Sequence, residues 1–83
     1  MNNKVLVNVN IPYLEKNYDM FIPVNRRIYS VIKMIKKSLI ELSEGSFIDG
    51  DYALYNGETG IVYDINMLVR DTDIRNDSKV ILL

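Results

Sequence analysis

Hydrophobic and polar residues alternate in two stretches near the start of the chain. The apolar members are Val5, Val7, Val9 and Ile11, then Tyr18, Met20 and Ile22. A period of two places one face of a strand on a core and leaves the other face outward. Pro12 lacks a backbone N–H and closes the first stretch, and a short polar loop leads to the second. The pattern predicts two strands joined as a hairpin.

A different period follows. Apolar residues recur three or four positions apart, as in a helix with one buried face. They are Ile28, Val31, Ile32, Ile35, Leu39 and Leu42. Asn25 has the side-chain oxygen of a helix N-cap, and Gly45 suits the left-handed conformation that ends many helices. We therefore expect a helix of about four turns between Asn25 and Gly45.

Three short apolar stretches complete the pattern. Residues 52–57 (YALYNG) predict a third strand, residues 61–64 (IVYD) a short fourth strand, and residues 79–83 (KVILL) the last strand. Leu68 and Ile74 are isolated apolar residues in a polar segment, which indicates a loop held to the core at two points. One amphipathic helix can cover only one face of one sheet. We predict an α+β domain with a mixed four- to five-stranded sheet and one helix packed on one face.

Composition limits the classes of function. The chain has 83 residues, so we expect one domain over residues 1–83. Its net charge of −1 lacks the cationic excess of a nucleic-acid binder. No apolar run is long enough for a membrane span, so we expect no membrane insertion and a cytoplasmic location.

Cysteine and histidine are both absent. Their absence removes disulfides, thiolate nucleophiles, the commonest general base near neutral pH and the commonest metal ligand. Two carboxylates could still act as acid and base, but a domain of this size has little room for a substrate pocket. Asp49 and Asp51 flank Gly50 without the spacing of a calcium loop. We therefore expect no enzyme, no cofactor and no metal.

The order and spacing of these elements resemble the ubiquitin-like β-grasp fold. The residues that carry the likeness are Val5, Val7, Val9, Met20, Ile22, Asn25, Ile28, Val31, Ile35, Gly45, Leu54, Gly57, Val62, Leu68, Ile74, Val80 and Leu82. Within that superfamily, the closing stretch DINMLVRDTDIRNDSKVILL is similar to that of YukD/EsaB-type proteins of bacterial type VII secretion systems. The resemblance implies an accessory protein that binds another protein, such as a component of the secretion system.

The resemblance also concerns the end of the chain. Ubiquitin and the sulfur-carrier members of the superfamily end in a flexible Gly-Gly tail, which threads into the site of an activating enzyme. The present sequence ends at Leu83 in a predicted strand. We therefore expect neither conjugation nor sulfur carriage.

The outward face of the predicted sheet is the candidate site. If the alternating apolar residues face the helix, the residues between them face outward. In the β-grasp strand order, the outward apolar residues would form one patch of Leu6, Phe21, Tyr55, Ile81 and Leu83. This arrangement turns Leu54 inward, and the opposite parity of the third strand is the alternative. Large apolar patches are rare on monomers, and ubiquitin binds partners through this face, so we predict a protein-binding site. Scattered exposed apolar residues are also common, and a homodimeric scaffold that buries this face is the alternative.

Basic residues form a second candidate surface. Arg26 and Arg27 lie at the predicted start of the helix, where the helix dipole disfavours cations. Lys33, Lys36 and Lys37 follow on its polar face. Such a stripe is usually a solvated surface, and an acidic partner is the other interpretation.

Overall fold

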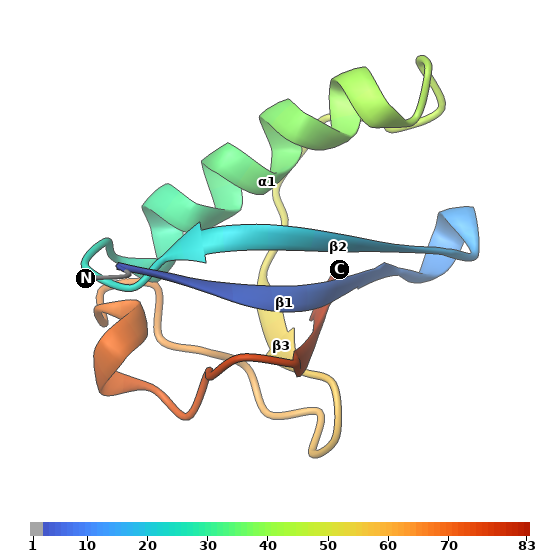
Figure 1. The fold of residues 1–83 in the computed structure, drawn as a ribbon. Helices are drawn as coiled ribbons and strands as arrows, with labels where there is room; N and C mark the ends of the chain where they lie inside the picture. The colour runs from blue at the N-terminus through green and yellow to red at the C-terminus, as the bar shows by residue number, and fades with distance from the viewer. Residues whose placement is uncertain (1–2) are drawn as a thin grey trace.

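The computed structural model describes residues 3–83 and has one α-helix and four strands in that range (Figure 1). The strands are β1 (Lys4–Ile11), β2 (Lys16–Pro23), β3 (Leu54–Asn56) and β4 (Ser78–Leu82), and the helix is α1 (Ile28–Leu42). Two short 3-10 turns cover Pro12–Leu14 and Val69–Asp71. The predicted α+β architecture with a single helix is confirmed.

The sheet is mixed, with the strand order β2-β1-β4-β3. β1 pairs antiparallel with β2 and parallel with β4, and β3 pairs antiparallel with β4. The strand predicted at residues 61–64 is wrong, because that segment makes only a single bridge between Val62 and Tyr55. The sheet therefore has four strands in the described residues, the lower of the two expected numbers.

The core lies between α1 and one face of the sheet. Its buried members are Val7, Val9, Ile11, Ile22, Ile28, Val31, Ile32, Ile35, Leu39, Phe47, Leu54, Val69, Ile74, Val80 and Leu82. Leu42 was predicted to be buried and is instead 54% exposed, because the C-terminal end of α1 rises away from the strands (Figure 1). Phe47, from the segment after the helix, is buried and stacks on Tyr52 at 5.2 Å between ring centroids.

The start of α1 differs from the prediction. The N-cap is Arg27 rather than Asn25, and no side chain caps the first turn. Instead, the N–H of Ile28 donates to the carbonyl of Met67, and the N–H of Tyr29 donates to the carbonyl of Ile65. The loop before the second 3-10 turn thus satisfies amides that a capping side chain would otherwise bind.

Gly45 adopts the left-handed conformation predicted for it, but α1 ends before this residue. Gly45 has the expected positive φ of 88°, and Glu44 before it also has a positive φ, of 53°. The helix itself ends earlier, with Ser43 as its C-cap. Two consecutive left-handed residues turn the chain back toward the sheet.

The anchored loop also differs in one residue. Ile74 is buried as predicted, but Leu68 is only half-buried, and its neighbour Val69 occupies the core. The 3-10 turn that begins at Val69 explains the change, since the Val69 N–H donates to the carbonyl of Arg26 and draws this residue inward. No helix in the described residues is long and apolar enough to cross a membrane.

We predict that Gly57→Ala destabilises the fold. A Cβ at Gly57 would lie 2.7 Å from the carbonyl oxygen of Lys79, which is backbone of β4 and cannot easily move. The expected loss in unfolding free energy is about 1 to 3 kcal/mol, measured by urea denaturation. Gly50→Ala is the matched control, because its Cβ would meet nothing closer than 3.9 Å. Equal stability of the two variants would contradict this account.

Candidate protein-binding site

The outward sheet face follows from the strand alternation. Because Val80 and Leu82 are buried, Ile81 between them points away from α1. Leu54 is buried and its neighbour Tyr55 faces outward, as predicted. Cross-strand partners share a face, and Tyr55 is paired with Ile81.

The register divides the predicted patch into two parts. Leu6 lies opposite Phe21 at one end of the sheet. Between this pair and the Tyr55–Ile81 pair runs a polar row, which consists of Asp19 on β2, Asn8 on β1 and Lys79 on β4. The expectation of one continuous patch is therefore wrong. The Leu6–Phe21 pair and the Tyr55–Ile81 pair are separate apolar areas, and only the second is near Leu83.

The polar row is held in place by hydrogen bonds. The Asn8 side-chain amide donates to Asp19 Oδ1 at 3.1 Å. The next row repeats this arrangement, with Asn10 Nδ2 donating to Asn17 Oδ1 at 3.0 Å. These side-chain ladders keep polar groups on the β1–β2 half of the face, so the apolar part lies over β4 and β3.

Val62 extends the apolar part and was missed from the sequence. Its bridge to Tyr55 places it beside that residue, and 53% of its surface is exposed. Leu83 lies on the other side of Tyr55. It follows the last residue of β4, exchanges two backbone hydrogen bonds with Ala53 and is 58% exposed. Tyr55, Val62, Ile81 and Leu83 together form what we call the Tyr55 cluster. The sequence pattern of residues 61–64 does not show which strand they lie beside. The bridge between Val62 and Tyr55 depends on tertiary pairing, so the sequence could not place Val62 next to Tyr55.

A hydrogen-bonded carboxylate supports the turn beside the cluster. The Tyr63 hydroxyl donates to Asp73 Oδ1 at 2.7 Å, and Asn56 Nδ2 donates to Asp73 Oδ2 at 3.0 Å. Asn56 Oδ1 in turn accepts the N–H groups of Glu58 and Thr59. Partial burial and the Asp73 carboxylate raise the pKa of Tyr63 well above its usual range. The network fixes the chain that carries Val62.

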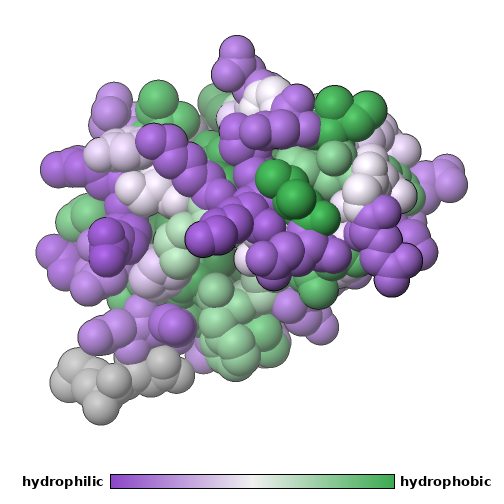
Figure 2. All heavy atoms as spheres, turned by 90° about the horizontal axis from the view of Figure 1, so that it is seen from above, coloured by the Kyte–Doolittle hydropathy of each residue, from purple (hydrophilic) through white to green (hydrophobic). Residues whose placement is uncertain are grey.

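The helical side of the molecule is less suited to a flat partner. In Figure 2, which looks down on that side, hydrophobic atoms form separate areas between hydrophilic ones. Lys36 in the basic stripe is occupied structurally, because its ammonium group pairs with Asp49 at 2.9 Å and donates to the carbonyl of Gly50. The pairing with Lys36 and the Gly50 N–H lower the pKa of Asp49.

Residues 3–83 contain no group of three or more acidic residues able to hold a metal ion. Arg27 Nη1 donates to the carbonyl of Asn66, which ties the helix start to the loop that caps it. This contact explains why a cation is tolerated there. Within residues 3–83, the Arg26 guanidinium makes no comparable contact.

The fold is that of ubiquitin-like β-grasp proteins. No protein-family model matches the sequence, and no curated protein matches it. Among solved structures, the ubiquitin-like domain of the Mycobacterium tuberculosis type VII secretion protein EccD1 has a TM-score of 0.75 and 16% identity, covering 100% of this chain and 99% of that chain. The EccD5 ubiquitin-like domain of Mycobacterium xenopi has a TM-score of 0.72 and 12% identity, covering 99% and 94%.

The same fold also occurs in a different setting. A chain of the toluene 4-monooxygenase HD complex has a TM-score of 0.78 and 6% identity, covering 95% of each chain. At such identities the likeness establishes the fold and leaves function to the surface residues.

We predict that the hydroxyl of Tyr63 makes stability depend on alkaline pH. Its raised pKa favours the neutral phenol in the folded state. Its contribution is therefore complete below the unfolded pKa of about 10 and is lost as pH rises above that value. Tyr63→Phe should lower the unfolding free energy by about 1 kcal/mol at pH 7 and reduce the decline above pH 10.

Denaturant titrations at pH 7 to 11 measure both effects. Tyr52→Phe is measured in the same titrations for comparison, because Tyr52 is a second tyrosine with a raised pKa. Hydrogen bonding with Tyr13, followed by burial, raises the pKa of Tyr52 to about 12. An unchanged alkaline slope in Tyr63→Phe would contradict the assignment.

Proposed function

We propose that residues 1–83 form one ubiquitin-like domain that binds another protein and does not catalyse a reaction. The observation that carries the proposal is the Tyr55 cluster, an apolar group on a sheet face that α1 leaves uncovered. Apolar and aromatic residues surrounded by polar groups are typical of the centre of a protein interface. The polar row formed by Asp19, Asn8 and Lys79 would form one rim of that interface.

The proposed setting is the cytoplasmic side of a bacterial type VII-like secretion system, where the chain would be an accessory or regulatory component. Support comes from two sources. The closing stretch of the sequence resembles YukD/EsaB-type proteins, and ubiquitin-like domains of EccD proteins share the fold over nearly their whole length. The partner on this proposal is another protein of the system.

The five residues predicted from the sequence would contribute unequally to partner binding. Tyr55, Ile81 and Leu83 lie in the Tyr55 cluster, so they would supply the centre of the interface. Leu6 and Phe21 lie beyond the polar row and would contact a partner only if it spans the whole face. Phe21 is 63% exposed, so its contribution can be tested separately.

We predict that the double variant Val62→Asp/Leu83→Asp loses partner binding while remaining folded. Both side chains are more than half exposed and lie outside the strands, so the substitutions disturb little packing. The measurement is cross-linking in the native host, followed by mass spectrometry of the captured proteins. We expect the captured amount of a secretion component to fall ten-fold or more, because the few dominant residues at the centre of an interface cost about 2 kcal/mol or more when they are changed.

Ile48→Asp is the matched control, because Ile48 is 69% exposed but lies on the loop after α1. Circular dichroism confirms the fold of each variant. If the double variant and the control capture the same proteins, the Tyr55 cluster is not the binding site. If the captured protein belongs to another system, the secretion role is wrong while the binding role stands.

A homodimeric scaffold is the competing function, and light scattering separates the two. We expect a molar mass near the monomer value of 9.6 kDa at micromolar concentration. A concentration-independent dimer that Val62→Asp/Leu83→Asp dissociates would favour the scaffold.

A further inference from the structure

β3 ends in an Asn-Gly pair, Asn56–Gly57, that the proposed binding site does not use. Asparagine is one of the thermolabile residues of proteins. It loses its side-chain amide most readily before glycine, because glycine has no side chain to keep its backbone nitrogen away from the asparagine carbonyl carbon. Asn56 is the only asparagine of the sequence that precedes a glycine. The pair is therefore the first place to look for this reaction.

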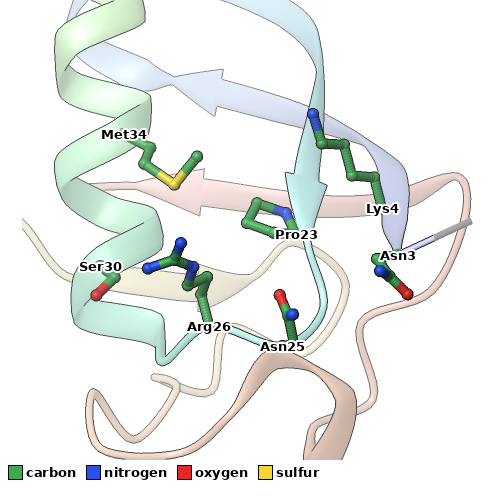
Figure 3. Close-up of a pocket in the computed structure, with 7 residues that line it drawn as sticks. All are labelled: Asn3, Lys4, Pro23, Asn25, Arg26, Ser30 and Met34. Atoms are coloured by element: carbon green, nitrogen blue, oxygen red, sulfur yellow. The ribbon is translucent and has the colours of Figure 1, made fainter.

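Two exposed asparagines near the start of α1 provide a comparison within the chain. In Figure 3, Asn3 and Asn25 line an open hollow of about 520 Å³. The residues that follow them are Lys4 and Arg26, whose long side chains hinder the attacking nitrogen. Asn56 has the opposite combination, an unhindered glycine nitrogen in a turn that the fold holds. Its reactivity therefore depends on the structure around it.

Hydrogen bonds hold the groups that the reaction needs. The Gly57 N–H, whose nitrogen would attack, donates to the carbonyl of Lys79 at 2.7 Å. The Asn56 side chain binds the backbone of the turn through Oδ1 and the Asp73 carboxylate through Nδ2. These bonds protect the pair more than burial does, because Asn56 is only half-buried and lines a hollow of about 170 Å³ that is large enough for water.

We propose that Asn56 is a covalent modification site that reacts only when the turn after β3 opens. In the open turn the Gly57 nitrogen attacks Asn56 Cγ. The N–Cγ bond forms, the Cγ–Nδ2 bond breaks, and ammonia leaves with the proton of the Gly57 nitrogen. Water then opens the resulting cyclic imide at one of its two carbonyl groups. The products are aspartate and isoaspartate, and in the second the main chain runs through the former side chain.

The aspartate product does not fit the closed turn. One of its carboxylate oxygens would lie 3.0 Å from Asp73 Oδ2, at the position from which Asn56 Nδ2 now donates. Two carboxylates at that distance repel each other, and neither can donate a hydrogen bond while both are ionised. At neutral pH the modified turn is therefore driven open.

The isoaspartate product disturbs the backbone of the same turn, because it adds one carbon atom to the main chain. The N–H of Asn56 donates to the carbonyl of Ile61 at 2.9 Å, and its carbonyl accepts the N–H of Gly60 at 2.8 Å. Asn56 is also paired with Val80 on β4. A longer main chain cannot keep this spacing. Both products thus release the segment that carries Val62.

The fold requires both members of the reactive pair. A Cβ at position 57 would lie 2.7 Å from the carbonyl oxygen of Lys79, and a carboxylate at position 56 would face Asp73. Gly57→Ala and Asn56→Asp would each stop the reaction, but each also opposes the closed turn. The reactivity of Asn56 is therefore a consequence of how β3 packs beside β4.

Ageing of the full chain at mildly alkaline pH tests the proposal. Samples are digested, and mass spectrometry measures the deamidated fraction of the peptide that contains Asn56. A synthetic peptide of residues 52–60 is the open reference. We expect Asn56 to react at least about 100-fold more slowly in the folded chain, because only the open fraction reacts. An isoaspartate-specific methyltransferase assay measures the isoaspartate share of the product.

Asp73→Asn tests whether opening of the turn controls the rate. The variant removes the charged acceptor of Asn56 Nδ2, so the turn opens more often, and deamidation of Asn56 should be about five- to ten-fold faster. Asp71→Asn is the matched control, because Asp71 is exposed and lies on the 3-10 turn Val69–Asp71. It should change the rate less than about two-fold.

Asn56→Asp reproduces one product and tests its effect on closure of the turn. We expect it to lower the equilibrium constant for folding at pH 7 about ten-fold or more, measured by urea denaturation. The double variant Asn56→Asp/Asp73→Asn exchanges the donor and the acceptor of the lost hydrogen bond, so it should recover most of this loss. Recovery separates repulsion at Asp73 from a general effect of charge at position 56.

Several results would overturn the proposal. Equal deamidation rates in the folded chain and the peptide would mean that the turn gives no protection, and an unreactive peptide would remove the modification itself. Equal rates in Asp73→Asn and Asp71→Asn would contradict control by opening. Full stability of Asn56→Asp, or no recovery in the double variant, would contradict the account of the product. None of these measurements involves a partner, so they leave the Tyr55 cluster to the capture experiment.

Discussion

The parallel pairing of β1 with β4 at the centre of the sheet is the constraint on which the other parts of the fold depend. Parallel neighbours require a long crossover between them, and here the crossover contains β2, α1 and β3. Since α1 packs on one face only, the other face is left without a covering layer. The backbone contact of Asp77 with Leu6 and the side-chain contact of Asn76 with the same residue fix the register of this central pair.

That register also decides which outward residues meet. A one-residue shift in β4 would reverse its faces and bury Ile81, so the position of the Tyr55 cluster follows from the pairing of β4 with both neighbours. Asn10 and Asn17 continue the row of Ile81 across β1 and β2, so the apolar area ends at β1. The outward face thus has an apolar area over β3 and β4 that is bordered by polar groups of β1 and β2.

Much of this could be predicted from the sequence, because periodicity reports burial directly. The alternation through Val7 and Val9 and the helical spacing of Ile28, Val31 and Ile35 identified the elements and the core face. The inward Leu54 and outward Tyr55 followed from the same argument. Continuity of the outward patch did not, since the pattern of each strand contains no information on its register with the next one.

The remaining differences arise where tertiary contacts replace local signals. Asn25 has the chemistry of an N-cap, but carbonyls from residues 65 and 67 occupy the positions that its side chain would serve. Leu42 follows the helical spacing, yet it lies at the end of α1 that rises away from the strands. Phe47 and Val69 are buried through the conformations of their segments, which periodicity does not describe.

The capping of α1 by a distant loop has a consequence for how the chain acquires its structure. Ile28 and Met67, which make one of these contacts, are 39 positions apart, so the first turn of the helix obtains this partner only when the later half of the chain is in place. A helix with its own capping side chain gains that stabilisation locally, whereas the first amides of this helix bind water until the distant loop reaches them. The later half of the sequence therefore stabilises the helix that the earlier half encodes, which couples the two halves during folding.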